Sequence, residues 1–158
     1  MSSAIVNNIF YISIFSQRHL LFTSFILLLL NLDSLKSINH LSDLKWKYRV
    51  LVVVTNEKEE IKDLIKFHSI ELNERELLVI QLDDEKAFID NTQMSKRFSQ
   101  SILKKVKNIP QEVYFVLIGK DGRVKNLFSK NTGMNEIFSE VDKMPMRINE
   151  MKRNPIDH

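Results

Sequence analysis

Four short segments between residues 50 and 128 have the apolar pattern of β-strands. Val50–Val54 (VLVVV), Leu77–Leu82 (LLVIQL) and Val113–Ile118 (VYFVLI) are apolar runs, which are typical of strands buried on both faces, as in a parallel sheet. Arg123–Phe128 is only partly apolar, as expected of an edge strand. Gly119–Gly122 (GKDG) comes directly before it. Because Asp-Gly tolerates the positive φ of hairpin turns, the last two strands are predicted to form a hairpin.

Between the predicted strands, apolar residues recur every three or four positions, as on the buried face of a helix. A first helix is expected at about residues 57–71, with Asn56 as its N-cap and Glu59 as the acid that returns a hydrogen bond to the cap. Residues 83–93 are polar and are expected to form a loop or short turn. A second helix is expected from Met94 to Val106.

A last helix is predicted from Met134 to Val141, and Pro145, which has no N–H to donate, is expected to kink or end it. The predicted order is therefore β-α-β-α-β-β-α. A right-handed crossover would make the first two strands parallel neighbours, and the hairpin would add two antiparallel strands to the same sheet. That arrangement is a thioredoxin-like α/β fold, a central mixed four-stranded sheet flanked by helices, and we assign it to residues 38–158.

Residues 1–37 are predicted to be a separate N-terminal segment. Arg18 is the one charged side chain in residues 1–32, and about 13 apolar residues follow it, ending at Leu32. That length suits the apolar core of a signal peptide and is short of the ~20 residues that span a bilayer. No Ala-x-Ala cleavage site follows. Three interpretations stay open: a signal peptide cleaved near residues 35–41, an uncleaved membrane anchor, and a buried core helix or misassigned start. The expected location is extracytoplasmic, either periplasmic or secreted.

The charge balance does not favour a nucleic-acid partner. The chain holds 23 bases and 20 acids, for a net charge of +3. The basic run Lys104–Lys107 lies at a predicted helix end, where cations complement the helix dipole, and it has no interleaved aromatics for stacking on bases. The four histidines are scattered without the spacing of metal ligands. We therefore predict no nucleic acid, no metal and no cofactor.

The chain has no cysteine, which limits what a thioredoxin-like fold can do here. Redox members of that fold place their cysteines where the first strand meets the first helix, and this chain has Thr55-Asn56-Glu57 there. Thiol–disulfide exchange requires a thiolate. Thiol–disulfide oxidoreductase and thiol peroxidase activities are therefore excluded for this chain alone.

Residues 142–151 (DKMPMRINEM) combine charges with methionines around Pro145. Arg147 and Glu150 are three positions apart and can pair along one helix turn. Asp142 precedes the proline and is a candidate cap for a helix that restarts after it. The methionines are flexible apolar groups, so the segment either packs within the fold or faces a partner.

These residues resemble the P-DUDES domain, a domain of unknown function found in bacterial exported proteins and in vertebrate extracellular-matrix proteins, including sushi-repeat proteins. The resemblance spans about Leu44 to Lys152 and rests on Trp46–Val52, Arg75–Ile80, Val116–Lys125 and Val141–Met151. It implies a thioredoxin- or peroxiredoxin-like fold, an extracytoplasmic setting and no established catalytic activity. The residues that match the family signature are Gly119, Lys120, Asp121, Gly122, Lys125, Asp142, Met144, Pro145, Met146, Arg147 and Glu150.

Two functions are weighed on this basis. The first is an exported, redox-inactive binding or structural module, with a protein or glycan partner outside the cytoplasm. The second is a cysteine-independent enzyme or small-ligand protein, in which Lys120, Asp121, Asp142 and Arg147 converge on a pocket and the arginine binds an anion. An uncleaved leader would make the chain a membrane-anchored accessory protein that contacts the membrane only through this segment. The charged signature residues are the binding candidates, and the structural candidates are Gly119, Gly122, Met144, Pro145 and Met146.

Overall fold

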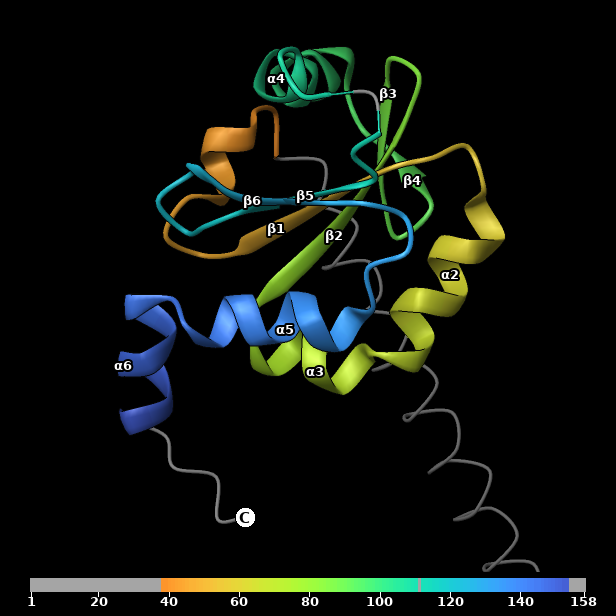
Figure 1. Ribbon diagram of the computed structural model, residues 1–158. Coiled ribbons are helices and arrows are strands. Elements are labelled where there is room, and N and C mark those ends of the chain that lie inside the picture. The colour runs from red at the N-terminus through yellow and green to blue at the C-terminus, as the bar shows by residue number, and fades with distance from the viewer. Residues whose placement is uncertain (1–37, 111, 154–158) are drawn as a thin grey trace, which may run out of the picture. The chain divides into compact units, whose positions relative to one another are not determined.

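A six-stranded mixed sheet forms the centre of the fold (Figure 1). The computed structural model describes residues 38–110 and 112–153, and the predicted leader at residues 1–37 lies outside the described residues. The strand order is β4-β3-β2-β1-β5-β6.

The four predicted strands are all present in this sheet. The strand β1 pairs in parallel with β2, with Arg49 opposite Leu77, and it pairs antiparallel with β5. The strand β5 then pairs antiparallel with β6, which is the predicted hairpin. The order and directions of these four strands are those of the thioredoxin-like fold, and this prediction is confirmed. Their bounds are Arg49–Val54 for β1, Leu77–Asp83 for β2, Phe115–Ile118 for β5 and Val124–Phe128 for β6.

The prediction of a loop at residues 83–93 is wrong, because this segment adds two strands to the sheet. The strands β3 (Lys86–Ile89) and β4 (Thr92–Gln93) pair antiparallel with β2 and with each other. Two tight turns make this possible, since Asp84 and the pair Asp90–Asn91 adopt positive φ. Asp and Asn visit that region more readily than most residues. Because polar turn residues flank it on both sides, the four-residue strand β3 does not stand out as an apolar run.

The single helix predicted at residues 57–71 is two helices. The helix α2 runs from Lys58 to Phe67 and α3 from Ser69 to Glu74, with His68 between them at φ −111°. The His68 ring packs edge-on against Phe138, with the ring centroids 5.6 Å apart. The chain changes direction between α2 and α3 (Figure 1). The apolar spacing continues through His68, so the sequence pattern does not show where the first helix ends.

The predicted capping pair, Asn56 with Glu59, is also wrong. The N-cap position of α2 is Glu57, and no side chain caps it. The Thr55 hydroxyl instead accepts the backbone N–H of Glu57 at 3.1 Å. Because this bond forms a turn before the helix begins, the helix starts later than the Asn-x-x-Glu spacing suggests.

The remaining helices lie close to their predicted positions. The helix α4 (Lys96–Val106) is capped by Ser95, whose hydroxyl accepts the Phe98 N–H at 3.2 Å. The helix α5 (Met134–Asp142) ends before Pro145, which then opens α6 (Pro145–Arg153). Proline is well suited to the first helical position, where its missing N–H has no partner to lose. A short 3-10 helix, η1 (Leu41–Leu44), precedes β1.

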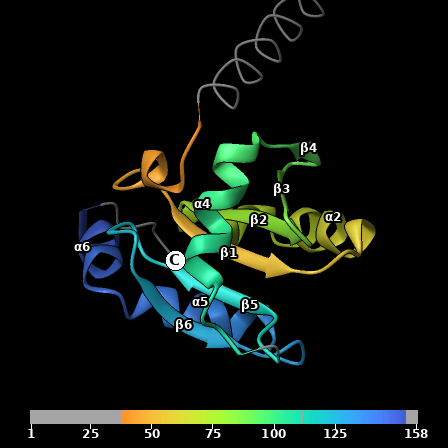
Figure 2. The ribbon, with the colours of Figure 1, turned by 90° about the horizontal axis from the view of Figure 1, so that it is seen from above.

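Helices cover both faces of the sheet. Figure 1 shows α4 on one face and α2, α3 and α5 on the other, and Figure 2 shows α4 lying across the central strands. Side chains alternate between the faces of a strand. Leu51 and Val53 of β1 accordingly belong to the core cluster that includes Ile137 and Phe138 of α5. The α4 face is closed by the buried Phe98 and by Ile102.

Within residues 38–110 and 112–153, no helix is long and apolar enough to cross a membrane. The alternatives for residues 1–37 stay predictions.

Candidate functional site

The position at which redox members of this fold carry cysteines is a hydrogen-bonded turn in this chain. Thr55, directly after β1, donates its N–H to the Leu82 carbonyl at 3.1 Å, and its hydroxyl accepts the Glu57 N–H. The buried Gln81 side chain donates to the Thr55 carbonyl at 3.0 Å. Backbone and amide groups therefore fix this turn, and no thiol is present for redox chemistry.

Tyr114, Glu60 and Lys130 form a polar cluster beside this turn. The Tyr114 hydroxyl donates to Glu60 Oε2 at 3.0 Å, and Lys130 Nζ lies 3.5 Å from the same oxygen. Burial raises the pKa of the Tyr114 hydroxyl, and the Glu60 carboxylate raises it further against an opposing hydrogen bond from Thr55. The charges of Glu57 and Glu60 raise the pKa of Lys130. A protonated phenol and a paired lysine join α2 to the loop after β6, and neither is a free base at neutral pH.

Within the described residues, a larger set of charges lies at the other end of β1, and we call it the charged network. It consists of Arg49, Arg75, Glu76, Lys120, Asp142, Arg147 and Glu150.

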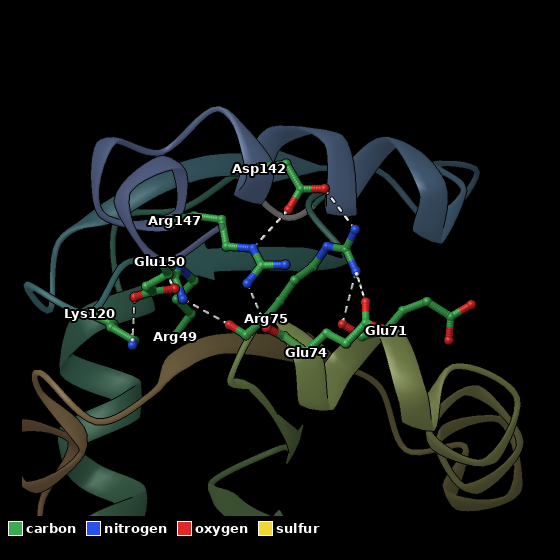
Figure 3. A network of polar contacts seen from close by, with 8 residues as sticks. All are labelled: Arg49, Glu71, Glu74, Arg75, Lys120, Asp142, Arg147 and Glu150. Carbon is green, nitrogen blue, oxygen red and sulfur yellow. Dashed lines mark hydrogen bonds and ion pairs between the residues drawn. The ribbon is translucent and has the colours of Figure 1, made fainter. Parts of the chain in front are cut away.

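Glu150 of α6 is held by two cations in one half of the network (Figure 3). Arg49 Nη2 lies 3.0 Å from Glu150 Oε2, and Lys120 Nζ lies 2.8 Å from Glu150 Oε1. Lys120 also pairs with Glu76. The Arg49 side chain is 1% exposed and that of Lys120 is 7% exposed. Two nearly buried cations therefore depend on two carboxylates.

Asp142 is held by two arginines in the other half (Figure 3). Arg75 Nη2 lies 2.7 Å from Asp142 Oδ2, and Arg147 Nε lies 3.2 Å from Asp142 Oδ1. Arg147 also donates to the Glu74 carbonyl at 2.7 Å. The two halves meet where Arg49 donates to the Arg75 carbonyl at 2.9 Å. The predicted role of Asp142 as a cap is thus replaced by pairing with two arginines.

The sequence forms this network through strand pairing. Arg49 opens β1, and Arg75 and Glu76 precede β2. The first residues of parallel neighbours lie at one edge of a sheet, and the Arg49 N–H accordingly donates to the Glu76 carbonyl at 2.8 Å. The helix α6 then presents Arg147 and Glu150, which are three positions apart, to that edge.

The network keeps Glu150 ionised. Burial alone would raise the pKa of the Glu150 carboxyl, but hydrogen bonds and charges from Lys120 and Arg49 outweigh it and hold the pKa below its ordinary value. A carboxylate in this state is a fixed counter-ion. It is poorly suited to accept or deliver a proton near neutral pH.

Asp121 and Lys125 form a separate pair in the hairpin turn. Lys125 Nζ lies 2.8 Å from Asp121 Oδ2, and Asp121 Oδ1 accepts the Arg123 N–H at 3.1 Å. Burial raises the pKa of the Asp121 carboxyl, but the hydrogen bonds from Lys125 and Arg123 dominate and lower it. Gly122 completes the turn at φ 75°. This pair stabilises the predicted reversal.

The structure therefore divides the predicted site residues into groups. Lys120, Asp142, Arg147 and Glu150 belong to the charged network, whereas Asp121 and Lys125 belong to the hairpin turn. Among the structural candidates, Met144 packs against the core cluster, Pro145 begins α6 and Met146 is exposed. A Cβ on Gly119 would lie 2.6 Å from Lys125 Cε, so this glycine allows the lysine to reach Asp121.

Sequence reasoning missed three members of the network, Arg49, Arg75 and Glu76. The signal that could have found them is a charged residue placed directly before, or at the start of, each of two buried parallel strands. Such charges must meet at one sheet edge and need carboxylates nearby.

Trp46 and Tyr48 were also missed as surface features. Trp46 lies in the loop before β1 with its backbone at φ 65°, and its N–H donates to the Lys120 carbonyl at 2.8 Å. Its side chain is 66% exposed, and Tyr48 is exposed as well. Two large aromatic groups thus lie on the surface, and the backbone of Trp46 adjoins the hairpin turn.

No metal centre is visible in the described part of the chain, where no three His, Asp or Glu side chains come together as ligands. The charged network could not hold a metal without releasing its own arginines and lysine from their carboxylates.

Comparison with known proteins gives a family and a set of distant folds. The family model described as a domain of unknown function (DUF4174) matches residues 40–150. The match confirms a domain of unknown function, and the name P-DUDES stays a prediction. No curated protein matches the chain.

The similar solved structures include three Plasmodium proteins. A reduced 2-Cys peroxiredoxin of Plasmodium vivax is 18% identical, with a TM-score of 0.45 over 72% of each chain. Thioredoxin peroxidase I of Plasmodium yoelii is 18% identical, with a TM-score of 0.43 over 74% of this chain and 82% of that chain. The mitochondrial 2-Cys peroxiredoxin of Plasmodium falciparum is 10% identical, with a TM-score of 0.42 over 73% of this chain and 84% of that chain. The fold assignment itself rests on the strand order and directions given above.

Proposed function

The chain belongs to the DUF4174 family, a domain of unknown function, and from that premise we propose that it is a redox-inactive binding module that acts outside the cytoplasm. The absence of cysteine removes the redox chemistry of the fold. What is left is a rigid scaffold with an exposed aromatic loop.

The conformation of Trp46 is the observation that carries the binding role. A bulky residue at positive φ is a genuine backbone outlier, and the left-handed conformation costs about 1–2 kcal/mol. The bond from the Trp46 N–H to the Lys120 carbonyl holds it there, and Lys120 is itself fixed by the charged network. Strain of this kind clusters at functional sites, and Trp and Tyr are the residues that most often dominate binding interfaces. The loop thus holds the Trp46 backbone in one conformation and leaves its side chain exposed to a partner.

The enzyme alternative has less support. It requires Lys120, Asp142 and Arg147 to face a substrate, but each of these groups is already paired with an oppositely charged group of the network. Asp121 pairs with Lys125 in a different place. A structural role for the signature charges, which fixes the scaffold behind the aromatic loop, agrees better with these contacts.

The location outside the cytoplasm is supported by the leader pattern. Residues 1–32 hold one charged side chain and end in an apolar run of signal-peptide length. The partner is then a protein or a glycan of the cell surface or its surroundings.

The test is a binding measurement with a matched aromatic control. The purified chain is immobilised, extracytoplasmic material is passed over it, and the retained partner is used to measure Kd for the wild type, Trp46→Ala and Phe67→Ala. Phe67 is 76% exposed but lies at the end of α2. We expect Trp46→Ala to weaken binding at least tenfold, which is about 1.4 kcal/mol, and Phe67→Ala to leave it unchanged. Enzymatic deglycosylation of the partner separates a glycan from a protein surface.

An unchanged Kd for Trp46→Ala, or an equal loss for Phe67→Ala, would show that the Trp46 loop is not the binding surface. Far-UV circular dichroism of each variant checks that the fold is intact.

A further inference from the structure

A cleft of about 380 Å³ lies between η1, the second half of α4 and the hairpin turn after β5. Its volume falls within the range of small-ligand sites, roughly 300–1,000 Å³. Lys45, Lys104 and Lys105 line it together with Ser42 and Gly122.

The charge of this cleft is of one sign. Its lining residues include three lysines and no acid. In the described part of the chain, none of these three ammonium groups has a carboxylate partner, whereas Lys120, Lys125 and other lysines do. Lys104 and Lys105 also complement the dipole at the end of α4, but this does not explain Lys45, which comes from a different element. Cations that converge on a concave surface attract anions into it.

The Lys45 side chain passes close to Gly122. A Cβ added to Gly122 would lie 2.4 Å from Lys45 Cε and 3.2 Å from Lys45 Cγ. The lysine side chain therefore lies along the bare glycine backbone, which is at φ 75°. The cleft thus has one cation beside the hairpin turn and two on α4.

We propose that this cleft binds a small polyanion that carries phosphate or sulfate groups. Lysine is an established phosphate binder that acts as a point charge, and the serine hydroxyl at the rim can donate a hydrogen bond. Three cations match a ligand with two or more negative groups, and the volume limits it to a small molecule or the end of a chain. This inference goes beyond the proposed function, since it does not depend on any contact made by Trp46.

The test is isothermal titration calorimetry of the full chain in a non-ionic detergent at about 0.15 M ionic strength. The probes are inorganic tripolyphosphate, a trisulfated heparin disaccharide, and citrate as a carboxylate of similar charge. The test variant is Lys104→Gln/Lys105→Gln. Its matched control is Lys96→Gln/Lys107→Gln, which removes the same amount of charge. Lys96 is the first residue of α4 and Lys107 is its C-cap, and both are exposed and outside the cleft. The single tryptophan, Trp46, directly follows Lys45 and provides a fluorescence signal for the same titrations.

We expect saturable binding that the test variant weakens at least tenfold and the control variant leaves within twofold. Tripolyphosphate alone would identify a phosphate compound, and the disaccharide alone would identify a sulfated sugar. Binding of neither, equal binding of citrate, or an equal loss in both variants would overturn the proposal. Failure here leaves the Trp46 measurement unaffected, because that test changes a different residue and measures binding of a partner isolated separately.

Discussion

Among single residues, Glu150 joins parts of the fold that are far apart in the sequence. Its carboxylate is the shared partner of Arg49 and Lys120, which come from β1 and from the turn after β5. Arg49 is 101 positions away in the sequence. Removing one partner of a buried ion pair leaves the other charge buried and unpaired. The resulting loss of stability is larger than the net stabilisation that the pair provides.

Glu150→Gln is therefore expected to lower the free energy of unfolding by about 2 kcal/mol. This is below the ~3–5 kcal/mol of a fully buried pair, because Glu150 itself is about one quarter exposed. Urea denaturation followed by circular dichroism measures the change. Glu140→Gln is the control, since Glu140 pairs with an exposed lysine at i+3 and should change stability by less than about 0.5 kcal/mol. Equal effects in the two variants would show that the network is not a special source of stability.

The same residue predicts a dependence on pH. The folded chain lowers the pKa of Glu150 below its ordinary value of 4.5, so the unfolded chain binds the proton more readily. The stability that Glu150 contributes is present above pH 4.5 and is lost as the pH falls through the lowered pKa. Denaturation at about pH 7 and about pH 3 should show the difference between wild type and Glu150→Gln shrinking in acid. A difference that stays constant would contradict the assigned ion pairs.

Gly122 and Gly133 differ in what an added methyl group would meet. Gly122 is at φ 75° with Lys45 in the way, whereas nothing lies within 4 Å of a Cβ on Gly133. Gly122→Ala is expected to destabilise the chain by about 1–2 kcal/mol and to displace Lys45 from the cleft. Gly133→Ala should stay within about 0.5 kcal/mol. Thermal unfolding compares the two, and a neutral Gly122→Ala would mean that the turn does not need this conformation.

At the scale of elements, the apolar pattern located the strands that are buried on both faces. It missed a short strand whose position depends on the turns on either side of it. The strands β1, β2 and β5 are buried on both faces and appear as apolar runs, so the sequence alone locates them. The strand β3 is short and lies between turns formed by Asp84 and Asp90–Asn91, whose positive φ no apolar pattern reports.

Only part of the charged network was predicted, for the same reason. Lys120, Asp142, Arg147 and Glu150 were found because a family signature marks them. Arg49 was not, because its partner Glu150 lies at the far end of the chain and the contact exists only once α6 packs at the sheet edge. An ion pair across such a separation leaves no periodic trace in one sequence.

The helix α4 supplies the element-scale prediction, since it lies across the central strands on one face of the sheet (Figure 2). Phe98 is fully buried, so Phe98→Ala should lower the free energy of unfolding by about 3–5 kcal/mol. Gln100→Ala, at an exposed position of the same helix, should change it by less than about 0.5 kcal/mol. Chemical denaturation measures both. A loss below about 1 kcal/mol for Phe98→Ala would mean that α4 packs loosely on the sheet.

For the molecule as a whole, the two ends of β1 have different roles. The end at which redox proteins of this fold carry cysteines is a hydrogen-bonded turn around Thr55. The opposite end holds the charged network, and the Trp46 loop and the lysine cleft both adjoin the hairpin turn near it. The features on which binding is proposed thus lie away from the end of the sheet at which redox proteins of this fold carry cysteines.

The leader provides the last prediction, and the start of the described fold narrows it. His40 and Asp43 form a capping box on η1, and the Leu41 N–H donates to the Ser101 hydroxyl at 2.8 Å. Cleavage beyond Asn39 would remove contacts that hold η1 against α4. A mature chain is therefore expected to begin between Leu35 and Asn39. N-terminal sequencing of the chain recovered from extracytoplasmic fractions measures this directly. A start at Met1 in a membrane fraction would indicate an anchor, and a full-length chain in the soluble cytoplasmic fraction would refute export.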